Sequence, residues 1–395
     1  MYFIPELPLQ LNALVLFGIL LLAGLIFGEI TRRIKFLPQI FGYTIAGFLL
    51  SPSVLNIINQ TAIEETRIFI QISLGLIMFD LGRYLDFRWL RHDLGILYSS
   101  LTESLLTFIL VYILLRFFDF PMLPALLAAT FAIATSPAVV MLVARDLNAN
   151  GPVTRRTLIL TSLNNFFSMV LFSILLPFTL TSVPSELYPF HAGYRLIGSI
   201  ILGLTTFLLI KYIAHLTQKI QIKQFVLVIG IVMLTIGLAN LLQLSTLLSL
   251  FVLGVAVRNF DKHHNLMEID IAWLARPFII ILFVISGFYL QFQGLWLTSA
   301  VVIAFILVRM LAKFVGVYLF AKSSRISKQQ SSNIALALTP MGGAAIGMYS
   351  ILEMGSPELT HQLAIIITAV LTVLNLVGPI AAQFAFIRAN ETEKE

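Results

Sequence analysis

Three titratable side chains stand inside long apolar runs of this chain rather than at their ends. They are Glu103, Arg309 and Lys313. A charge at membrane depth is costly and usually functional. A carboxyl or ammonium group can release and take up a proton, so Glu103 and Lys313 are candidate proton carriers. Arg309, one helical turn before Lys313, stays charged and is a candidate gate or structural cation. The alternative is that Glu103 only pairs with Arg309 or Lys313 and joins two helices.

A second group of polar residues lies beside an expected helix break. Thr135, Ser136 and Pro137 interrupt an apolar run, and a proline removes a backbone donor and clashes with the preceding turn. Asn164 and Asn165 stand in the next run. A broken helix frees carbonyls for a cation and amides for an anion, and carboxamides add neutral oxygens and donors. The group predicts a transport site, although carboxamides also bond across helices as structural contacts.

A similar interruption appears near the end of the chain. Pro340, Gly342 and Gly343 break the apolar run of residues 332–352. This run is seven segments after the first broken one, so the two would cross the membrane in opposite directions. Paired breaks in matching halves point to a transporter site. The alternative is that proline and glycine are simply more common in membrane helices.

The composition places these residues in a membrane protein. The 395 residues are 59% hydrophobic and 11% charged, with a mean hydropathy of +0.96, whereas a soluble chain is about a quarter charged. The absence of cysteine excludes disulfides and thiolate sites. The six histidines show no ligand spacing, so no metal site is expected. The basic residues follow a membrane topology, so we expect no nucleic-acid partner. We also expect no cofactor and no enzymatic activity.

The apolar runs predict an all-α polytopic fold with about 13 transmembrane helices. They form one transmembrane unit, 1–390, with inverted six-helix repeats at about 10–180 and 222–387, a connector helix at 194–213 and a short cytoplasmic tail at 391–395. No appended soluble domain is expected. The expected segments are 10–30, 36–52, 67–83, 94–117, 123–144, 157–180, 194–213, 222–243, 245–259, 272–292, 296–321, 332–352 and 362–387.

The basic residues set the expected orientation. Nearly all of the 25 Lys and Arg residues follow odd-numbered segments, and only Arg67, Arg116 and Arg195 lie in the alternate loops. Since Lys and Arg accumulate on the cytoplasmic side, the N-terminus is expected outside and the C-terminus in the cytoplasm, in the inner (plasma) membrane. Asp80 at the cytoplasmic end of the third segment is expected to be solvated.

Several short motifs occur in an order that resembles one known family. The chain resembles the cation:proton antiporter superfamily, particularly the bacterial sodium/potassium–proton exchangers of its second branch. Arg309 and Lys313 stand where that family keeps basic residues. The other matching stretches are Gly28 to Arg32 with Pro38, Gly42, Gly47, Ser51 and Pro52, Leu74 to Gly82 with Asp86, Ala134 to Val140, Gly151 to Thr154, Leu338 to Ala345, and Gly378 with Pro379.

The resemblance implies a homodimer in which a core domain with two crossed broken helices moves against a dimer domain. One departure concerns the site. The family usually has Asn-Asp or Asp-Asp where this chain has Asn164-Asn165, and that aspartate is the family's cation ligand and proton carrier. The Thr135-Ser136-Pro137 stretch is likewise a variant of a motif that often contains aspartate. Asparagine does not titrate, so proton coupling does not carry over at this position.

Three functions are compatible with these residues. The first is a sodium or potassium:proton antiporter in the lipid bilayer, in which Glu103 or Lys313 carries the proton. The second is a carrier of an anion or another solute, because Lys313 and Arg309 leave the site net positive. The third is a non-transporting sensor relative. The first is preferred, since a lysine can alternate between protonated and neutral forms.

Overall fold

The computed structural model describes residues 12–34, 37–52, 54–55, 66–179, 184–216, 221–261, 271–288, 290 and 295–392. These described ranges are helical and contain no strand. The helices are α1 (Ala13–Arg32), α2 (Gln39–Leu50), α4 (Arg67–Gly82), α5 (Phe87–His92), α6 (Leu94–Phe117), α7 (Met122–Ile133), α8 (Pro137–Asp146), α9 (Pro152–Leu175), α10 (Tyr188–Leu216), α11 (Gln221–Leu241), α12 (Thr246–Phe260), α13 (Ile271–Phe288), α14 (Leu295–Leu319), α15 (Lys328–Ala337), α16 (Gly343–Gly355) and α17 (Pro357–Arg388).

Every expected apolar segment coincides with a helix or with an interrupted pair of helices, which confirms the polytopic all-α fold. In the described ranges, seven spans are long and apolar enough to cross a membrane, and five shorter apolar helices accompany them. The six-residue helix α5 lies between the shorter apolar helix α4 and the span α6, and it was not expected. The division into two inverted six-helix halves stays a prediction.

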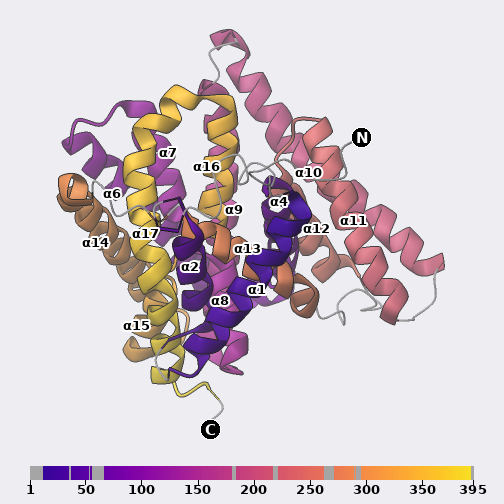
Figure 1. Cartoon of the computed structure of the whole chain (residues 1–395), viewed down its shortest axis with the longest axis horizontal. Coiled ribbons are helices and arrows are strands. Elements are labelled where there is room, and N and C mark those ends of the chain that lie inside the picture. Colours follow the sequence, from indigo (N-terminus) through magenta and orange to yellow (C-terminus); the bar gives the residue numbers. More distant parts are fainter. Residues whose placement is uncertain are drawn as a thin grey trace, which may run out of the picture.

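The helices form two bundles that touch along a limited interface (Figure 1). The core bundle contains α6 to α9 and α14 to α17, where α14 packs closely on α6. The flanking bundle contains α1, α2, α4, α11, α12 and α13, where α4 packs on α12 and α2 packs on α1 and α13. Helix α10 packs on α12 and also on α9, so it connects the bundles. We call the face that holds the last turn of α17, at the bottom of Figure 1, the tail face.

Both expected breaks are present, and they meet inside the core bundle. The first lies between Ile133 and Pro137, where proline begins α8 in the position that lacks an intrahelical partner. The second lies between Ala337 and Gly343. The Ser136 N–H donates to the Pro340 carbonyl oxygen at 2.9 Å, which ties one break to the other. We call this meeting point the crossing.

Two boundaries at the tail face differ from the sequence expectation. Helix α9 begins at Pro152, five residues before the expected 157, because Gly151 and Pro152 form a helix start and the following arginines lie in its first turns. A short tail separate from the helical unit was expected from residue 391 onward, but Glu391 is bound to the start of α9. Its carboxylate accepts from the N–H groups of Val153 and Thr154, each at 2.7 Å.

Candidate functional site

Arg309 on α14 joins the two helix breaks at the crossing. Its guanidinium donates to the carbonyls of Ala132 at 2.8 Å and Ala134 at 2.9 Å in the first break. It also donates to the carbonyls of Thr339 at 2.7 Å and Pro340 at 3.4 Å in the second. Helix C-termini carry partial negative charge, so the ends of α7 and α15 are a favourable place for this fully buried cation. Arg309 therefore bridges the two breaks at the crossing.

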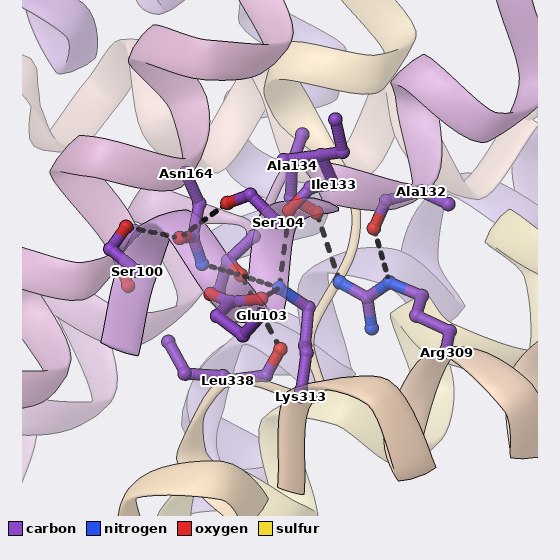
Figure 2. Close-up of polar contacts among 12 residues, drawn as sticks. Ser100, Glu103, Ser104, Ala132, Ile133, Ala134, Asn164, Arg309, Lys313 and Leu338 are labelled. Carbon is purple, nitrogen blue, oxygen red and sulfur yellow. Dashed lines mark hydrogen bonds and ion pairs between the residues drawn. The ribbon is translucent and has the colours of Figure 1, made fainter. Parts of the chain in front are cut away.

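Lys313, one turn further along α14, faces the acidic residue of α6 (Figure 2). Its ammonium nitrogen lies 3.1 Å from Glu103 Oε2, and both side chains are fully buried. The same nitrogen donates to the Ile133 carbonyl at 3.1 Å and to Thr135 Oγ1 at 3.2 Å. The only deep carboxylate predicted from sequence is thus paired with Lys313 beside the first break.

A glycine on α14 allows this pair to form. A Cβ atom on Gly316 would lie 2.2 Å from the Glu103 Cβ and 2.5 Å from its Cα, which is far inside contact distance. The backbone of α14 therefore approaches α6 closely, three residues after Lys313. Gly316 was not singled out from sequence, although small residues commonly mark close helix approaches in membranes.

The two carboxamides of α9 complete the contacts around Thr135. Asn164 Nδ2 donates to Thr135 Oγ1 at 3.3 Å, and Asn164 Oδ1 accepts from Ser100 at 3.1 Å and Ser104 at 3.4 Å (Figure 2). Asn165 Nδ2 donates to the Thr135 carbonyl at 2.7 Å. Thr135 is consequently shared by α9 and α14. The serines were missed from sequence, but they share the buried face of α6 with Glu103 at helical spacing.

Several buried oxygens near the crossing have no hydrogen-bond partner within the described part of the chain. They include Asn165 Oδ1, Ser136 Oγ, Glu103 Oε1 and Asn375 Oδ1. Asn375 on α17 and Ser136 both face Gly342, where an added Cβ would lie 2.9 Å from Asn375 Oδ1 and 3.3 Å from Ser136 Oγ. Unpaired buried oxygens are uncommon, and such atoms are suitable ligands for a dehydrated cation.

Hydrogen bonds to carbonyls and to Glu103 offset the positive charges of Arg309 and Lys313. Glu103 carries one negative charge against two positive charges on Arg309 and Lys313. The carbonyls at the ends of α7 and α15 receive the donors of Arg309, and Lys313 has both a carboxylate and a carbonyl. The positive side chains are therefore already engaged by protein oxygens. The net positive charge on which the anion-carrier alternative rests is offset by these helix ends.

The comparisons with known proteins agree with this arrangement. A family model described as sodium/hydrogen exchanger, transmembrane, matches residues 17–385. The chain belongs to the sodium/hydrogen exchanger family. Members of this class are secondary transporters, so the chain is a multi-pass cation:proton antiporter, and nothing favours the anion-carrier or sensor alternatives.

Two known antiporters resemble this exchanger-family chain over nearly its whole length. The Na(+)/H(+) antiporter of Enterococcus hirae is 24% identical over 382 residues, covering 93% of this chain and 96% of the relative. The sodium proton antiporter MjNhaP1 from Methanocaldococcus jannaschii, at pH 8, has a TM-score of 0.72 at 20% identity and covers 97% of this chain. The alignment includes 99% of that structure, and a 3D EM map of the same antiporter gives a TM-score of 0.73 at 18% identity. At these identities, the structural likeness shows a shared fold.

The exchanger fold brings together every site residue predicted from sequence. Thr135, Asn164, Lys313 and Glu103 form one connected hydrogen-bond group, and Arg309 lies beside it. Ser136 lies in the first break, and Asn165 of α9 donates to the Thr135 carbonyl of the same break. The helix-breaking residues Pro137, Pro340, Gly342 and Gly343 border the two breaks. Their roles in transport are taken up below.

The expectation that Asp80 is solvated is wrong. Its side chain is only 8% exposed and pairs with Arg83 at 3.3 Å and with Arg145 at 2.9 Å. Arg145 lies on α8 in the core bundle, whereas Asp80 lies on α4 in the flanking bundle. A helix end in this fold is covered by the neighbouring bundle, so a terminal position does not ensure exposure.

Proposed function

We propose that this chain exchanges a monovalent cation, sodium or potassium, for a proton at the Glu103–Lys313 pair. The observation that supports it is the 3.1 Å contact between Lys313 Nζ and Glu103 Oε2, fully buried at the crossing. The resemblance to the exchangers implies a titratable aspartate where this chain has the Asn164-Asn165 pair. The Glu103–Lys313 pair provides the titratable groups that the two asparagines lack.

The exchange follows from the charge of the pair. With Lys313 protonated, the ammonium neutralises Glu103. A cation that binds beside Glu103 displaces the ammonium, and Lys313 then releases its proton toward water. The total charge of the pair and its cation is the same before and after, so exchange of one cation for one proton is electroneutral. Arg309 keeps its charge throughout, because a guanidinium does not deprotonate in proteins.

Neutral oxygens beside the pair would hold the cation. The Thr135 hydroxyl is bonded to Lys313 at 3.2 Å and is released when the ammonium leaves. Asn164 Oδ1, Asn165 Oδ1 and Ser136 Oγ lie around the same break, and the last two have no partner among the residues described. Hard monovalent cations bind such oxygens, and a half-unwound helix supplies carbonyls as well.

The two bundles suggest how the site would reach both sides of the membrane. The core bundle carries the complete site, and it would move against the flanking bundle during alternating access. We assign the flanking bundle to the interface of a homodimer, with the N-terminus outside and the C-terminus in the cytoplasm of a cell whose plasma membrane holds the protein. Two inverted halves, about 10–180 and 222–387 with a connector at 194–213, would relate the two breaks.

The test is proton movement in proteoliposomes that contain a trapped pH dye, after sodium or potassium is added. We expect cation-driven proton flux in the wild type and none in Lys313→Gln. Glu103→Gln alone leaves a buried ammonium unpaired, which should lower the free energy of unfolding by about 3–5 kcal/mol. The double variant with Glu103→Gln and Lys313→Met is therefore also measured. The paired variant should fold and be silent.

Matched controls separate this role from general damage. Glu186→Gln and Lys322→Gln make the same chemical changes at exposed positions and should retain flux. A membrane-potential dye in the same vesicles tests electroneutrality. Normal cation-driven flux in the paired variant would overturn the assignment of the proton to Glu103 and Lys313, and an absence of flux in a folded wild type would overturn antiport itself.

A further inference from the structure

A charged cavity of about 500 Å³ opens between the two bundles at the tail face. The flanking bundle contributes the ends of α4 and α12, and the core bundle contributes the end of α8 and the first turns of α9. Trp89 of the short helix α5 completes the lining. The cavity is distinct from the crossing, because Arg145 lies eight residues along α8 from Pro137, or about 12 Å. Its volume lies in the range of sites for small organic ligands.

Arginine dominates the lining of this cavity. Four guanidinium groups face two carboxylates, which leaves two positive charges in excess. The residues are Arg83, Arg145, Arg155 and Arg258 against Asp80 and Asp86. Asp80 holds Arg83 and Arg145, and Asp86 accepts from Arg258 at 3.0 Å. Each acid therefore fixes the position of a neighbouring arginine.

Arg155 differs from the other three arginines. It forms no ion pair within the described ranges, and its guanidinium lies over the Trp89 ring at 5.1 Å from the ring centre. It is exposed at the mouth of the cavity on the second turn of α9. An arginine oriented by an aromatic ring, with no carboxylate, keeps its donors available for a ligand.

Asp86 is held in its ionised form, so it continues to orient Arg258. Partial burial alone would raise the pKa of Asp86. Hydrogen bonds from the Arg88 N–H and from Arg258 outweigh burial and hold the pKa of Asp86 below its usual value. The positive excess is therefore present at neutral pH.

We propose that this cavity binds a phosphate-bearing anion through Arg155 and the arginines that Asp80 and Asp86 orient. Guanidinium groups match phosphate geometry through paired N–H donors, and Asn150 adds a neutral polar group to the wall. The Thr154 hydroxyl also lines the wall, but it already donates to Glu391 Oε2 at 2.8 Å. A free nucleotide or pyrophosphate and the headgroup of an anionic lipid share this chemistry. The site lies outside the proposed exchange site and does not depend on it.

A ligand here would regulate transport, because it would contact both bundles. Arg258 and Arg83 belong to the flanking bundle, whereas Arg145 and Arg155 belong to the core bundle. Binding to all of them stabilises the present arrangement relative to any arrangement in which the bundles have moved apart. The bound phosphate therefore slows the exchange cycle.

The experiment measures the melting temperature of the full chain in nanodiscs of neutral lipid, titrated with pyrophosphate or ADP at constant ionic strength. We expect a saturable rise in melting temperature and an apparent affinity about tenfold weaker in Arg155→Gln. Arg91→Gln is the matched control, because Arg91 is an exposed arginine of α5 outside the cavity lining. It should bind as the wild type does.

Nanodiscs that contain phosphatidylglycerol form the second arm. Stabilisation by pyrophosphate or ADP in neutral lipid identifies a free phosphate ligand, and stabilisation only by phosphatidylglycerol, lost in Arg155→Gln, identifies a lipid headgroup. Either result supports the site, and the active ligand should slow exchange in vesicles relative to the same protein without it. No stabilisation of the wild type in either arm, or equal responses of Arg155→Gln and Arg91→Gln, would overturn it.

Discussion

At both the crossing and the tail face a charged side chain binds a helix end, but the two side chains have opposite charges. At the crossing, the Arg309 guanidinium donates to carbonyls at the C-terminal ends of α7 and α15. At the tail face, the Glu391 carboxylate accepts from the first N–H groups of α9. In each place a charge complements the helix dipole. The difference is burial, because Arg309 is fully buried whereas Glu391 is half-buried.

Burial also decides which partner a charge requires. Arg309 has no carboxylate within hydrogen-bond reach in the described structure and depends on carbonyls from both breaks. Arg145 at the tail face has a side chain 36% exposed and pairs with Asp80. Water can replace part of the second interaction but none of the first. The comparison teaches that the buried Arg309 holds the two breaks together, whereas a partly exposed arginine such as Arg145 can exchange its carboxylate for water.

The largest expected effect is at Arg309. We expect Arg309→Lys to lower the free energy of unfolding by about 3–5 kcal/mol, because a compact ammonium cannot span both breaks and leaves buried carbonyls unpaired. Thermal unfolding in detergent is the measurement. Arg116→Lys is the control, since Arg116 bonds the Phe120 carbonyl at an exposed helix end. Equal stability of the two variants would mean that burial does not distinguish these arginines.

An intermediate effect is expected at Glu391. Glu391→Ala should lower the free energy of unfolding by about 1–2 kcal/mol, because the first N–H groups of α9 lose their acceptors. Glu391→Gln keeps one acceptor oxygen and loses the other together with the charge, so its effect should be smaller than that of the alanine change, at about 0.5–1 kcal/mol. Thermal unfolding of the two variants side by side tests the order. If the alanine variant has the same melting temperature as the wild type, Glu391 does not cap α9.

The smallest stability effect is expected at the pair that links the bundles. Asp80→Asn should lower the free energy of unfolding by about 1 kcal/mol, because the amide oxygen still accepts from one of the two arginines, Arg83 or Arg145, and Arg145 is more than a third exposed. The rate of cation–proton exchange should instead rise, by a factor of about 5 at most, since a contact between moving bundles is weakened. Stopped-flow measurement of proton flux gives this rate.

The control for this pair lies within one bundle. Asp93, just before α6, binds Arg156 of α9 at 2.8 Å, and both helices belong to the core bundle. Asp93→Asn should therefore leave the exchange rate unchanged. A rise in rate for Asp93→Asn, or a fall for Asp80→Asn, would contradict the idea that the Asp80 pair restrains movement between the bundles.

The sequence alone determined the helical spans, the two breaks and the family. Spans follow from the length of apolar runs, and the first break follows from Pro137, whose ring cannot continue the preceding helix. Glu103, Arg309 and Lys313 could be recognised because a charge inside an apolar run is rare. The motifs around both breaks were sufficient to identify the exchanger family.

The tertiary structure decided which of these residues meet. When a helix is apolar on every face, its pattern does not tell which face meets a neighbour, so Glu103 could have faced either Arg309 or Lys313. The close approach at Gly316 and the fold of the core bundle place it against Lys313. The burial of Asp80 and the capping by Glu391 join residues more than 60 positions apart, and only packing brings such residues together.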